Sequence, residues 1–197
     1  MPVAASLNKV LIPKAVLICA DIELEAQAAT LLDTEITPIE FLNSLLQRQL
    51  YPDAVRFLAR ALPKREATWW ACVCARSSLN DATPSEMISA LEAAEAWVYT
   101  PNEIHRRKAH LAAQAAAFDN PVAWAAMAAF WSEGSMAPEE APVVPPADHL
   151  TSKAVAGSVM LSAVLGQPEL APQKYPFFIE QGIDIANGGN GKVWQGQ

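Results

Sequence analysis

The histidines and cysteines are the first candidates for metal chemistry in this chain, but their spacing does not suit it. His105 and His110 are five residues apart, whereas two histidines that bind zinc from one helix are four apart. Cys72 and Cys74 would point about 200° apart on a helix, so their thiols would share neither a metal nor a disulfide. The sequence contains no HExxH motif and no cysteine–histidine cluster with zinc spacing. We therefore expect no metal site.

Signatures of nucleophilic catalysis and phosphate binding are also missing. No serine lies in a GxSxG motif, and the sequence has no GxGxxG or Walker loop. The glycine-rich residues 187–191 follow a predicted helix, whereas a phosphate-binding loop precedes one. Asp53, Glu180 and Asp184 are candidate catalytic carboxylates, but nothing in the sequence pairs them. We therefore predict a protein that is not an enzyme, with no catalytic residues and no cofactor.

Charged residues gather around Lys64, Arg65 and Glu66 and again at residues 106–108. One interpretation is that Arg65 and Arg106 form an anion clamp. The interpretation that we favour is a set of ion pairs between helices and solvated faces, because exposed ion pairs are common and individually weak. The net charge of −7 opposes binding to a phosphate backbone, so we expect no nucleic-acid partner.

The tryptophans are the most distinctive side chains. Trp69 and Trp70 are adjacent, so they point about 100° apart on a helix and at most one can face the core centrally. Trp124 and Trp131 are two turns apart on one face. Core packing is the default for such residues, but an exposed aromatic side chain would be an anchor for a protein partner. The candidate partner-binding residues are Trp69, Trp124, Phe130, Trp131 and Arg65.

The composition indicates a helical domain. The chain has 197 residues, of which 52% are hydrophobic and 18% are charged, so it has enough apolar side chains for a core. Only 8 residues are glycine, and alanines occur in runs, which favours helices over a turn-rich β-fold. The three cysteines do not form a disulfide framework, and we expect buried free thiols in a reducing compartment.

No segment of the sequence resembles a membrane span or a secretory signal. The apolar residues 15–20 are too few for a signal peptide and are ended by Asp21. The longest uncharged run, residues 154–168, is shorter than a membrane span and contains glycine and serine. We therefore expect a soluble, cytoplasmic protein that does not bind a membrane.

A polar residue followed by proline marks the start of several predicted helices. The four pairs are Thr37-Pro38, Thr83-Pro84, Thr100-Pro101 and Asn120-Pro121. Glu40 completes a capping box with Thr37. This punctuation predicts an all-α fold of about eight short helices in consecutive antiparallel hairpins, similar to a helical array. There is no strict repeat period, so a regular solenoid stays only an alternative.

Local sequence patterns predict three further helices and the residues that they bury. Residues 13–32 are predicted to form one helix, with a buried strand at residues 16–19 as the alternative. The helix that begins at Glu103 is predicted to pack through an apolar stripe of Ile104, Leu111, Ala115 and Phe118. A last helix is predicted over residues 175–186, followed by a stop at Asn187-Gly188-Gly189.

We predict four regions along the chain. Residues 1–136 form the main helical domain, and residues 137–148 form an extended, proline-rich crossing. Residues 149–189 form a C-terminal helical pair that docks on the main domain, and residues 190–197 form a mobile tail.

Several distinctive segments occur in a fixed order: DAVRFLA, ALPKREATWWAC, AEAWV, AAFWSEGSMAP, VPP and IEQGIDIANGG. Together they resemble a family of uncharacterised bacterial proteins associated with type VI secretion gene neighbourhoods. The resemblance spans about residues 15–189. It implies a genetic context of spike proteins, tip proteins, effectors and loading adaptors, but no family chemistry and no catalytic residues.

The function that we expect is that of a non-enzymatic accessory protein. Such an adaptor or co-chaperone would bind an effector or a spike or tip protein, with a partner segment held in an apolar groove between helices. The alternatives are a secreted cargo or effector with an unrecognised activity, and an immunity protein that blocks an effector. The oligomeric state is left open.

Overall fold

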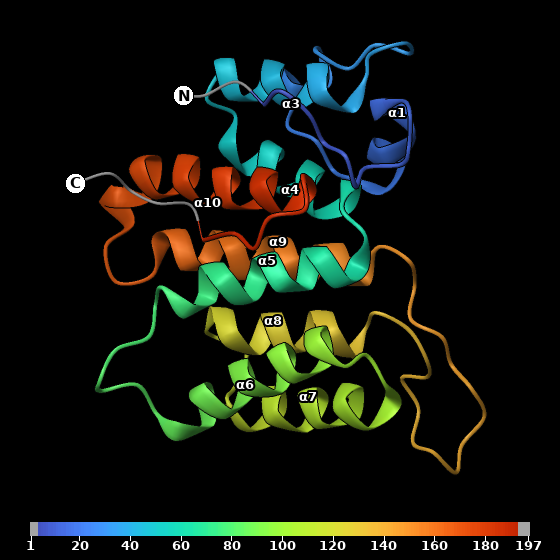
Figure 1. The fold of residues 1–197 in the computed structure, drawn as a ribbon, viewed down its shortest axis with the longest axis vertical. Coiled ribbons are helices and arrows are strands. Elements are labelled where there is room, and N and C mark those ends of the chain that lie inside the picture. Colours follow the sequence, from blue (N-terminus) through green and yellow to red (C-terminus); the bar gives the residue numbers. More distant parts are fainter. Residues whose placement is uncertain (1–3, 193–197) are drawn as a thin grey trace.

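A computed structural model describes residues 4–192, and every regular element in that range is helical (Figure 1). This confirms the predicted all-α fold, with eight helices of ten or more residues. They are α3 (Pro38–Gln47), α4 (Tyr51–Ala61), α5 (Lys64–Arg76), α6 (Ser85–Tyr99), α7 (Glu103–Ala115), α8 (Pro121–Phe130), α9 (Leu150–Val164) and α10 (Ala171–Ala186).

Residues 13–32 do not form the predicted single helix. This part contains only α1 (Ala15–Ile18), the 3-10 turn η1 (Cys19–Asp21) and α2 (Ala26–Ala29), so the alternative strand is wrong too. The backbone is extended at Ile22 and Glu25. The Glu25 N–H donates to the buried Asp53 carboxylate of α4 at 3.1 Å. This tertiary hydrogen bond takes the place of a helical one and explains the interruption.

Side-chain caps start three of the helices. At α3, the Glu40 N–H donates to Thr37 Oγ1 and the Thr37 N–H donates to Glu40 Oε2 at 3.0 Å, which is the predicted capping box. Asn120 accepts from the Ala123 N–H at 3.0 Å and starts α8. The cap of α7 is Asn102, two residues after the predicted Thr100, and it accepts from the His105 N–H at 2.8 Å.

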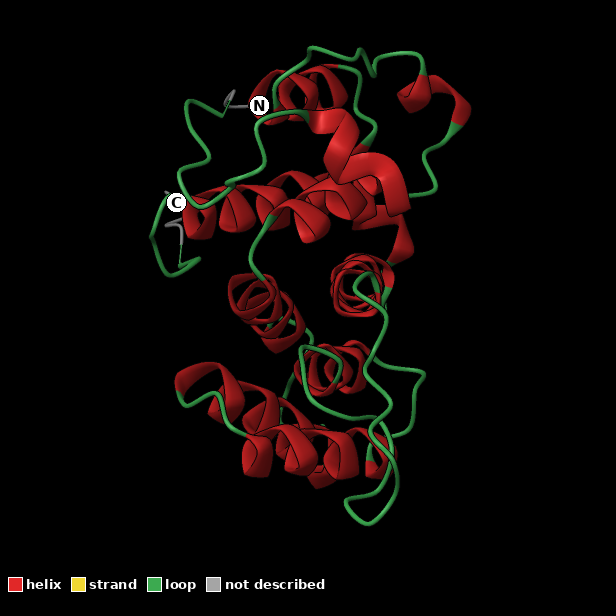
Figure 2. Cartoon of the chain, turned by 90° about the vertical axis from the view of Figure 1, so that its right-hand side faces the viewer, coloured by secondary structure: helices red, strands yellow, loops and turns green. Residues whose placement is uncertain are grey.

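Helix α9 lies at the centre of the fold, where it contacts α4, α5, α8 and α10. Small residues let α8 approach it closely, because Gly157 faces the Trp124 ring and the Ser158 hydroxyl donates to the Pro121 carbonyl at 2.8 Å. The side view shows the helices in successive layers along the long axis (Figure 2). One hydrophobic core runs from Ala4 to Ala186, so the two C-terminal helices share it with the earlier ones.

Helix α10 is longer than the sequence predicts. It begins at Ala171, directly after the 3-10 turn η2 (Pro168–Leu170), and contains Pro176. It ends at Ala186 as predicted, with Asn187 as its C-cap and Gly188 at a φ of 95°. Within residues 4–192, no single helix is long and apolar enough to cross a membrane. Helix α9 and the segment Pro168–Ala186 have the required length and hydropathy only when they are taken together, and the two are bent by 109° relative to each other.

Trp70 joins α5 to α10 inside the core. Its side chain is fully buried, and its indole N–H donates to the Phe178 carbonyl at 2.7 Å. Gly182 of α10 lies so close that an added Cβ would be 2.8 Å from the Trp70 ring and 2.7 Å from Leu58. The fit of a tryptophan against a glycine thus fixes how near α10 approaches α4 and α5.

The predicted packing face of α7 is wrong. Ile104 and Leu111 are 67% and 65% exposed, and Phe118 beyond the helix end is 47% exposed. The buried residues of α7 are instead Arg106, Ala109 and Ala113. The alanines let α7 approach its neighbours closely. The arginine on the same face can be buried because its guanidinium is hydrogen-bonded and paired with a carboxylate.

The last described residues are attached to the helical body. The Trp69 indole N–H donates to the Asn190 carbonyl at 2.9 Å, and the Gly191 N–H donates to Asp184 Oδ2 at 2.9 Å. The predicted mobile tail begins at residue 190, and its residues 193–197 lie outside the described residues.

Candidate functional site

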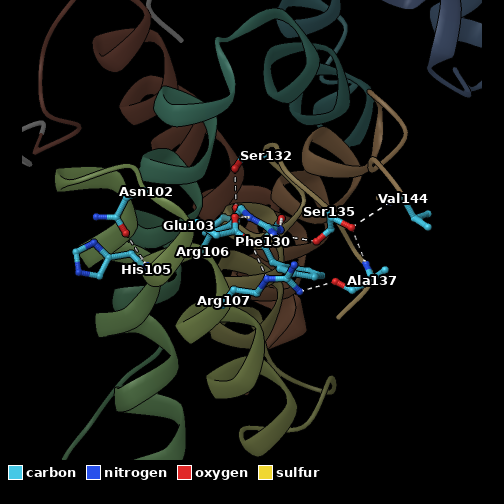
Figure 3. Close-up of polar contacts among 11 residues, drawn as sticks. Asn102, Glu103, His105, Arg106, Arg107, Phe130, Ser132, Ser135, Ala137 and Val144 are labelled. Carbon is cyan, nitrogen blue, oxygen red and sulfur yellow. Dashed lines mark hydrogen bonds and ion pairs between the residues drawn. The ribbon is translucent and has the colours of Figure 1, made fainter. Parts of the chain in front are cut away.

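Arg106 is the most unusual side chain of the fold, because it is a fully buried cation (Figure 3). Its guanidinium donates to the Phe130 carbonyl at 2.7 Å and to the Ser135 carbonyl at 2.8 Å. It also forms a two-pronged ion pair with Glu103, one turn earlier. Its carbon atom Cζ lies 4.7 Å above the centre of the Phe130 ring. The arginine is therefore fully engaged in holding the end of α8 and the chain that follows it.

That chain, residues 131–149, is tethered at both ends. Near its start, Arg107 donates to the Ala137 carbonyl at 2.7 Å. Near its end, Asp148 accepts from Arg60 at 2.7 Å and lies 3.0 Å from the Lys64 ammonium. Between these anchors the Met136 N–H donates to the Val144 carbonyl at 2.8 Å, so the proline-rich segment before the last two helices forms a loop that folds back at its base. We call residues 137–147 the proline loop.

Gly134 is required where the chain passes Arg106. Its φ is 71°, which side chains rarely adopt, and a Cβ there would lie 2.8 Å from Arg106 Nε. The backbone can therefore cross the guanidinium only at a residue without a side chain.

The ion pairs at these anchors shift the pKa values of their acids. Hydrogen bonds from Arg106 and Arg107 lower the pKa of Glu103 to about 2. Hydrogen bonding to Lys64, with help from Arg60, lowers the pKa of Asp148. Nearby His110, which stacks on Phe130 at 4.0 Å between ring centres, has a lowered pKa because it is partly buried and faces the two arginines. The anchors are thus in their charged, hydrogen-bonded form at neutral pH.

Glu103→Gln should make the stability of the protein less dependent on acid. The pKa of Glu103 is lowered on folding, so its contribution is complete above the ordinary pKa of 4.5 and is lost as the pH falls towards 2. Because Glu103 is 47% exposed, we expect that contribution to be only about 1 kcal/mol. Urea unfolding at several pH values, followed by tryptophan fluorescence, measures it.

Glu180→Gln is the matched control, because Glu180 is an exposed carboxylate of α10 with no ion pair among residues 4–192. It should leave the acid dependence unchanged. An equal change in both variants would mean that general charge repulsion, and not the Arg106 contact, causes the effect.

An aromatic row runs from the end of α7 along α8. Phe118 and Trp124 lie 6.1 Å apart, and Trp124 and Trp131 lie 6.4 Å apart, measured between ring centres. The Trp124 indole N–H donates to the Phe118 carbonyl at 3.0 Å. Both tryptophans are partly exposed and Phe118 is exposed. We call Phe118, Trp124 and Trp131 the aromatic row; it offers a protein partner three ring surfaces.

A second surface is the cleft beside Trp69. The Trp69 and Tyr99 rings lie 5.7 Å apart, and Tyr99 is 68% exposed. Arg65 stands one helical turn before Trp69, and its Nε donates to the Val98 carbonyl at 2.6 Å. We call this surface the Trp69 cleft; its lining is Lys9, Arg65, Glu66, Trp69, Val98, Tyr99, Ile185, Gly189 and Asn190. Its lining combines two aromatic rings with the Arg65 guanidinium.

A family model described as a family of unknown function (DUF6931) matches residues 41–186, the greater part of the chain. The chain belongs to this family. No curated protein and no solved structure matches it. The match runs from Phe41 of α3 to the last residue of α10. The aromatic row of this DUF6931 member lies within the matched region, and so do six of the nine residues that line the Trp69 cleft.

The structure separates the predicted partner-binding residues of this DUF6931 member. Trp124 and Trp131 belong to the aromatic row, while Trp69 and Arg65 belong to the cleft. Phe130 is 2% exposed and stacks inside the fold, so it has no surface to offer a partner. An anion clamp of Arg65 and Arg106 is also wrong, because Arg106 is buried and saturated by Glu103 and two carbonyls.

The cysteines of this DUF6931 member are free and buried, as predicted. Burial raises the pKa of Cys19 to about 12 and also raises the pKa values of Cys72 and Cys74, so the thiols stay protonated. Among residues 4–192, no group of three or more histidine, cysteine or acidic side chains is placed to hold a metal ion.

The sequence patterns do not indicate Tyr99 of the cleft or Phe118 of the aromatic row as surface residues. Phe118 is predicted to face inward because it continues the helical spacing of Leu111. The helix ends before it, however, and Ala117 has a φ of 59° that turns the chain outward. The exposure of Tyr99 could have been predicted from its position directly before Thr100-Pro101. A helix usually ends before such a pair, and side chains at a helix end are often exposed.

Proposed function

We propose that this protein is a non-enzymatic accessory protein of a type VI secretion system, an adaptor or co-chaperone that works in the cytoplasm. Its partner would be an effector or a spike or tip protein. The observation that carries the proposal is the aromatic row, in which partly exposed tryptophan rings lie next to one another. Tryptophan is among the side chains that most often contribute the largest share of the binding energy at a protein interface.

The surroundings of the row suit a helical partner segment. Leu111 and Ile104 of α7 are exposed apolar residues on the same helix that leads to Phe118. An amphipathic helix of the partner could place its apolar residues against the rings, in the helix-in-groove manner. The secretion context rests on the resemblance of the chain to proteins from type VI gene neighbourhoods.

Trp131→Ala tests this proposal. When both proteins are purified from the native cell with a tag, we expect the variant to capture about one tenth as much partner as the wild type, or less. The reason is that one interface tryptophan commonly contributes about 2 kcal/mol or more to the binding free energy. Its helical circular dichroism should be unchanged, because the contact of the Trp131 carbonyl with the Thr151 hydroxyl belongs to the backbone. Leu165→Ala, an exposed apolar residue at the end of α9, is the control and should retain the partner.

The identity of the captured protein decides between the functions. A spike, tip or effector protein in equal amount supports the adaptor. An effector whose toxicity appears only when this gene is deleted would instead identify an immunity protein. The appearance of the chain itself in the medium would identify a secreted cargo. Loss of helical circular dichroism in Trp131→Ala would make Trp131 a core residue and remove the row as a binding surface.

A further inference from the structure

The proline loop has the geometry of a polyproline ligand. Pro142, Pro145 and Pro146 have φ fixed near −65° by their rings, and the residue before each proline is confined to extended conformations. Residues 142–147 accordingly adopt neither helix nor strand. Pro142-Val143-Val144-Pro145 also has the spacing of a PxxP segment, in which two prolines lie one polyproline turn apart.

The loop is held in place before it meets any partner. The Ser135 hydroxyl accepts from the Ala137 N–H at 3.1 Å and from the Val144 N–H at 3.0 Å, which closes the base of the loop (Figure 3). The arginine anchors described above fix the same base from outside. A ligand that is already ordered loses little conformational entropy on binding, so even a small contact area can be sufficient.

The loop presents apolar and acidic groups together. Val143 is 75% exposed and Val144 is 46% exposed, although valine is usually buried. Glu139 and Glu140, four and three residues before Val143, are exposed, and neither forms an ion pair within residues 4–192. The matching receptor is therefore an aromatic groove with a cation at one end.

The Trp69 cleft is such a receptor. Grooves lined by aromatic side chains are the usual docking sites of polyproline segments. Trp69 and Tyr99 form such a lining, and Arg65 has no carboxylate partner in the described part of the chain. No residue of the proline loop lines the cleft of its own molecule.

The spacing of the two surfaces also agrees. Arg65 precedes Trp69 by one helical turn, about 6 Å along the axis. Glu140 precedes Val143 by three residues and lies in the turn that the Ala141 N–H closes onto the Pro138 carbonyl at 3.1 Å. Three residues span at most about 10 Å, and the long side chains of arginine and glutamate add to their reach. One loop can therefore place Val143 on the rings and Glu140 on Arg65.

We propose that the proline loop of one copy docks in the Trp69 cleft of a second copy. The contact is head-to-tail, since the loop and the cleft are different surfaces, and it links copies into a row or a closed ring. The aromatic row takes no part in it, so this self-association goes beyond the proposed function and does not rest on it.

Sedimentation of the purified full-length chain, from about 1 μM to 1 mM, tests the proposal. The wild type should show an average mass that rises with concentration. Val143→Asp and Tyr99→Ala should each be monomeric and fully helical, because both side chains are exposed. An equal mixture of these two variants should form a dimer and stop there, since one variant keeps only its cleft and the other only its loop.

Leu111→Asp is the matched control, because it adds the same charge to another exposed apolar residue and should self-associate like the wild type. A wild type that stays monomeric over the whole range overturns the proposal. So does loss of association in Leu111→Asp but not in Val143→Asp, which would assign the contact to α7. Trp131→Ala should self-associate normally, so the outcome is independent of the partner-capture experiment.

Discussion

Replacing Arg106 with methionine should lower the free energy of unfolding by about 2–4 kcal/mol, because a buried carbonyl left without its donor costs about 1–3 kcal/mol and Arg106 serves two of them. Methionine has a similar length but no donors. It would leave the Phe130 and Ser135 carbonyls without their partner inside the protein. Urea unfolding measures the loss.

The same variant should free the base of the proline loop. Hydrogen exchange should become faster at the Ala137 and Val144 amides, which donate to the Ser135 hydroxyl in the intact fold. Arg106→Lys should be intermediate, because an ammonium group cannot reach Glu103 and both carbonyls at once. A loss below about 1 kcal/mol with unchanged exchange would contradict the assigned role of Arg106.

Trp70→Ala should cost about 3–5 kcal/mol of stability, which is typical for deleting a buried tryptophan. It removes the contact with Gly182 and leaves the Phe178 carbonyl without its donor. Because both partners are on α10, we expect that helix to exchange its amide protons much faster while α6 and α7 change little.

The neighbouring tryptophan gives a direct control. Trp69 is partly exposed and gives the chain after α10 one hydrogen bond, to the Asn190 carbonyl, so Trp69→Ala should cost about 1 kcal/mol. Equal losses in the two variants would mean that Trp70 does not serve as the link between α5 and α10. The comparison uses the same residue type in consecutive positions of one helix.

Local sequence signals predict the helices of this protein well because they are made by neighbouring residues. The Thr37–Glu40 capping box needs only four residues, and it forms as expected. The inward face of α4, with Val55 and Leu58, follows from helical spacing and is buried as expected. Such features depend little on the rest of the chain.

The orientation of α7 could not be predicted in this way. Ile104 and Leu111 are better core residues than an arginine by composition alone, yet Arg106 is the one inside. Its burial depends on carbonyls of Phe130 and Ser135, which are more than twenty residues away. The same holds for the interruption at residues 22–25, which depends on Asp53 of α4.

For the candidate site, too, the sequence indicates the individual residues but not how they are grouped in space. The sequence indicates Trp69, Arg65, Trp124 and Trp131 as anchors, since their residue types favour interfaces. It does not indicate that they form two surfaces, because Tyr99 joins Trp69 across two helices and Phe118 joins Trp124 across a turn.

The central position of α9 determines when this protein can fold during its synthesis. The helices α4, α5 and α8 each pack against α9, but they leave the ribosome before it. Until residue 164 has been added, the side of each of these helices that packs on α9 has no covering helix. We therefore expect the nascent chain to complete its core late, only after α9 has left the ribosome.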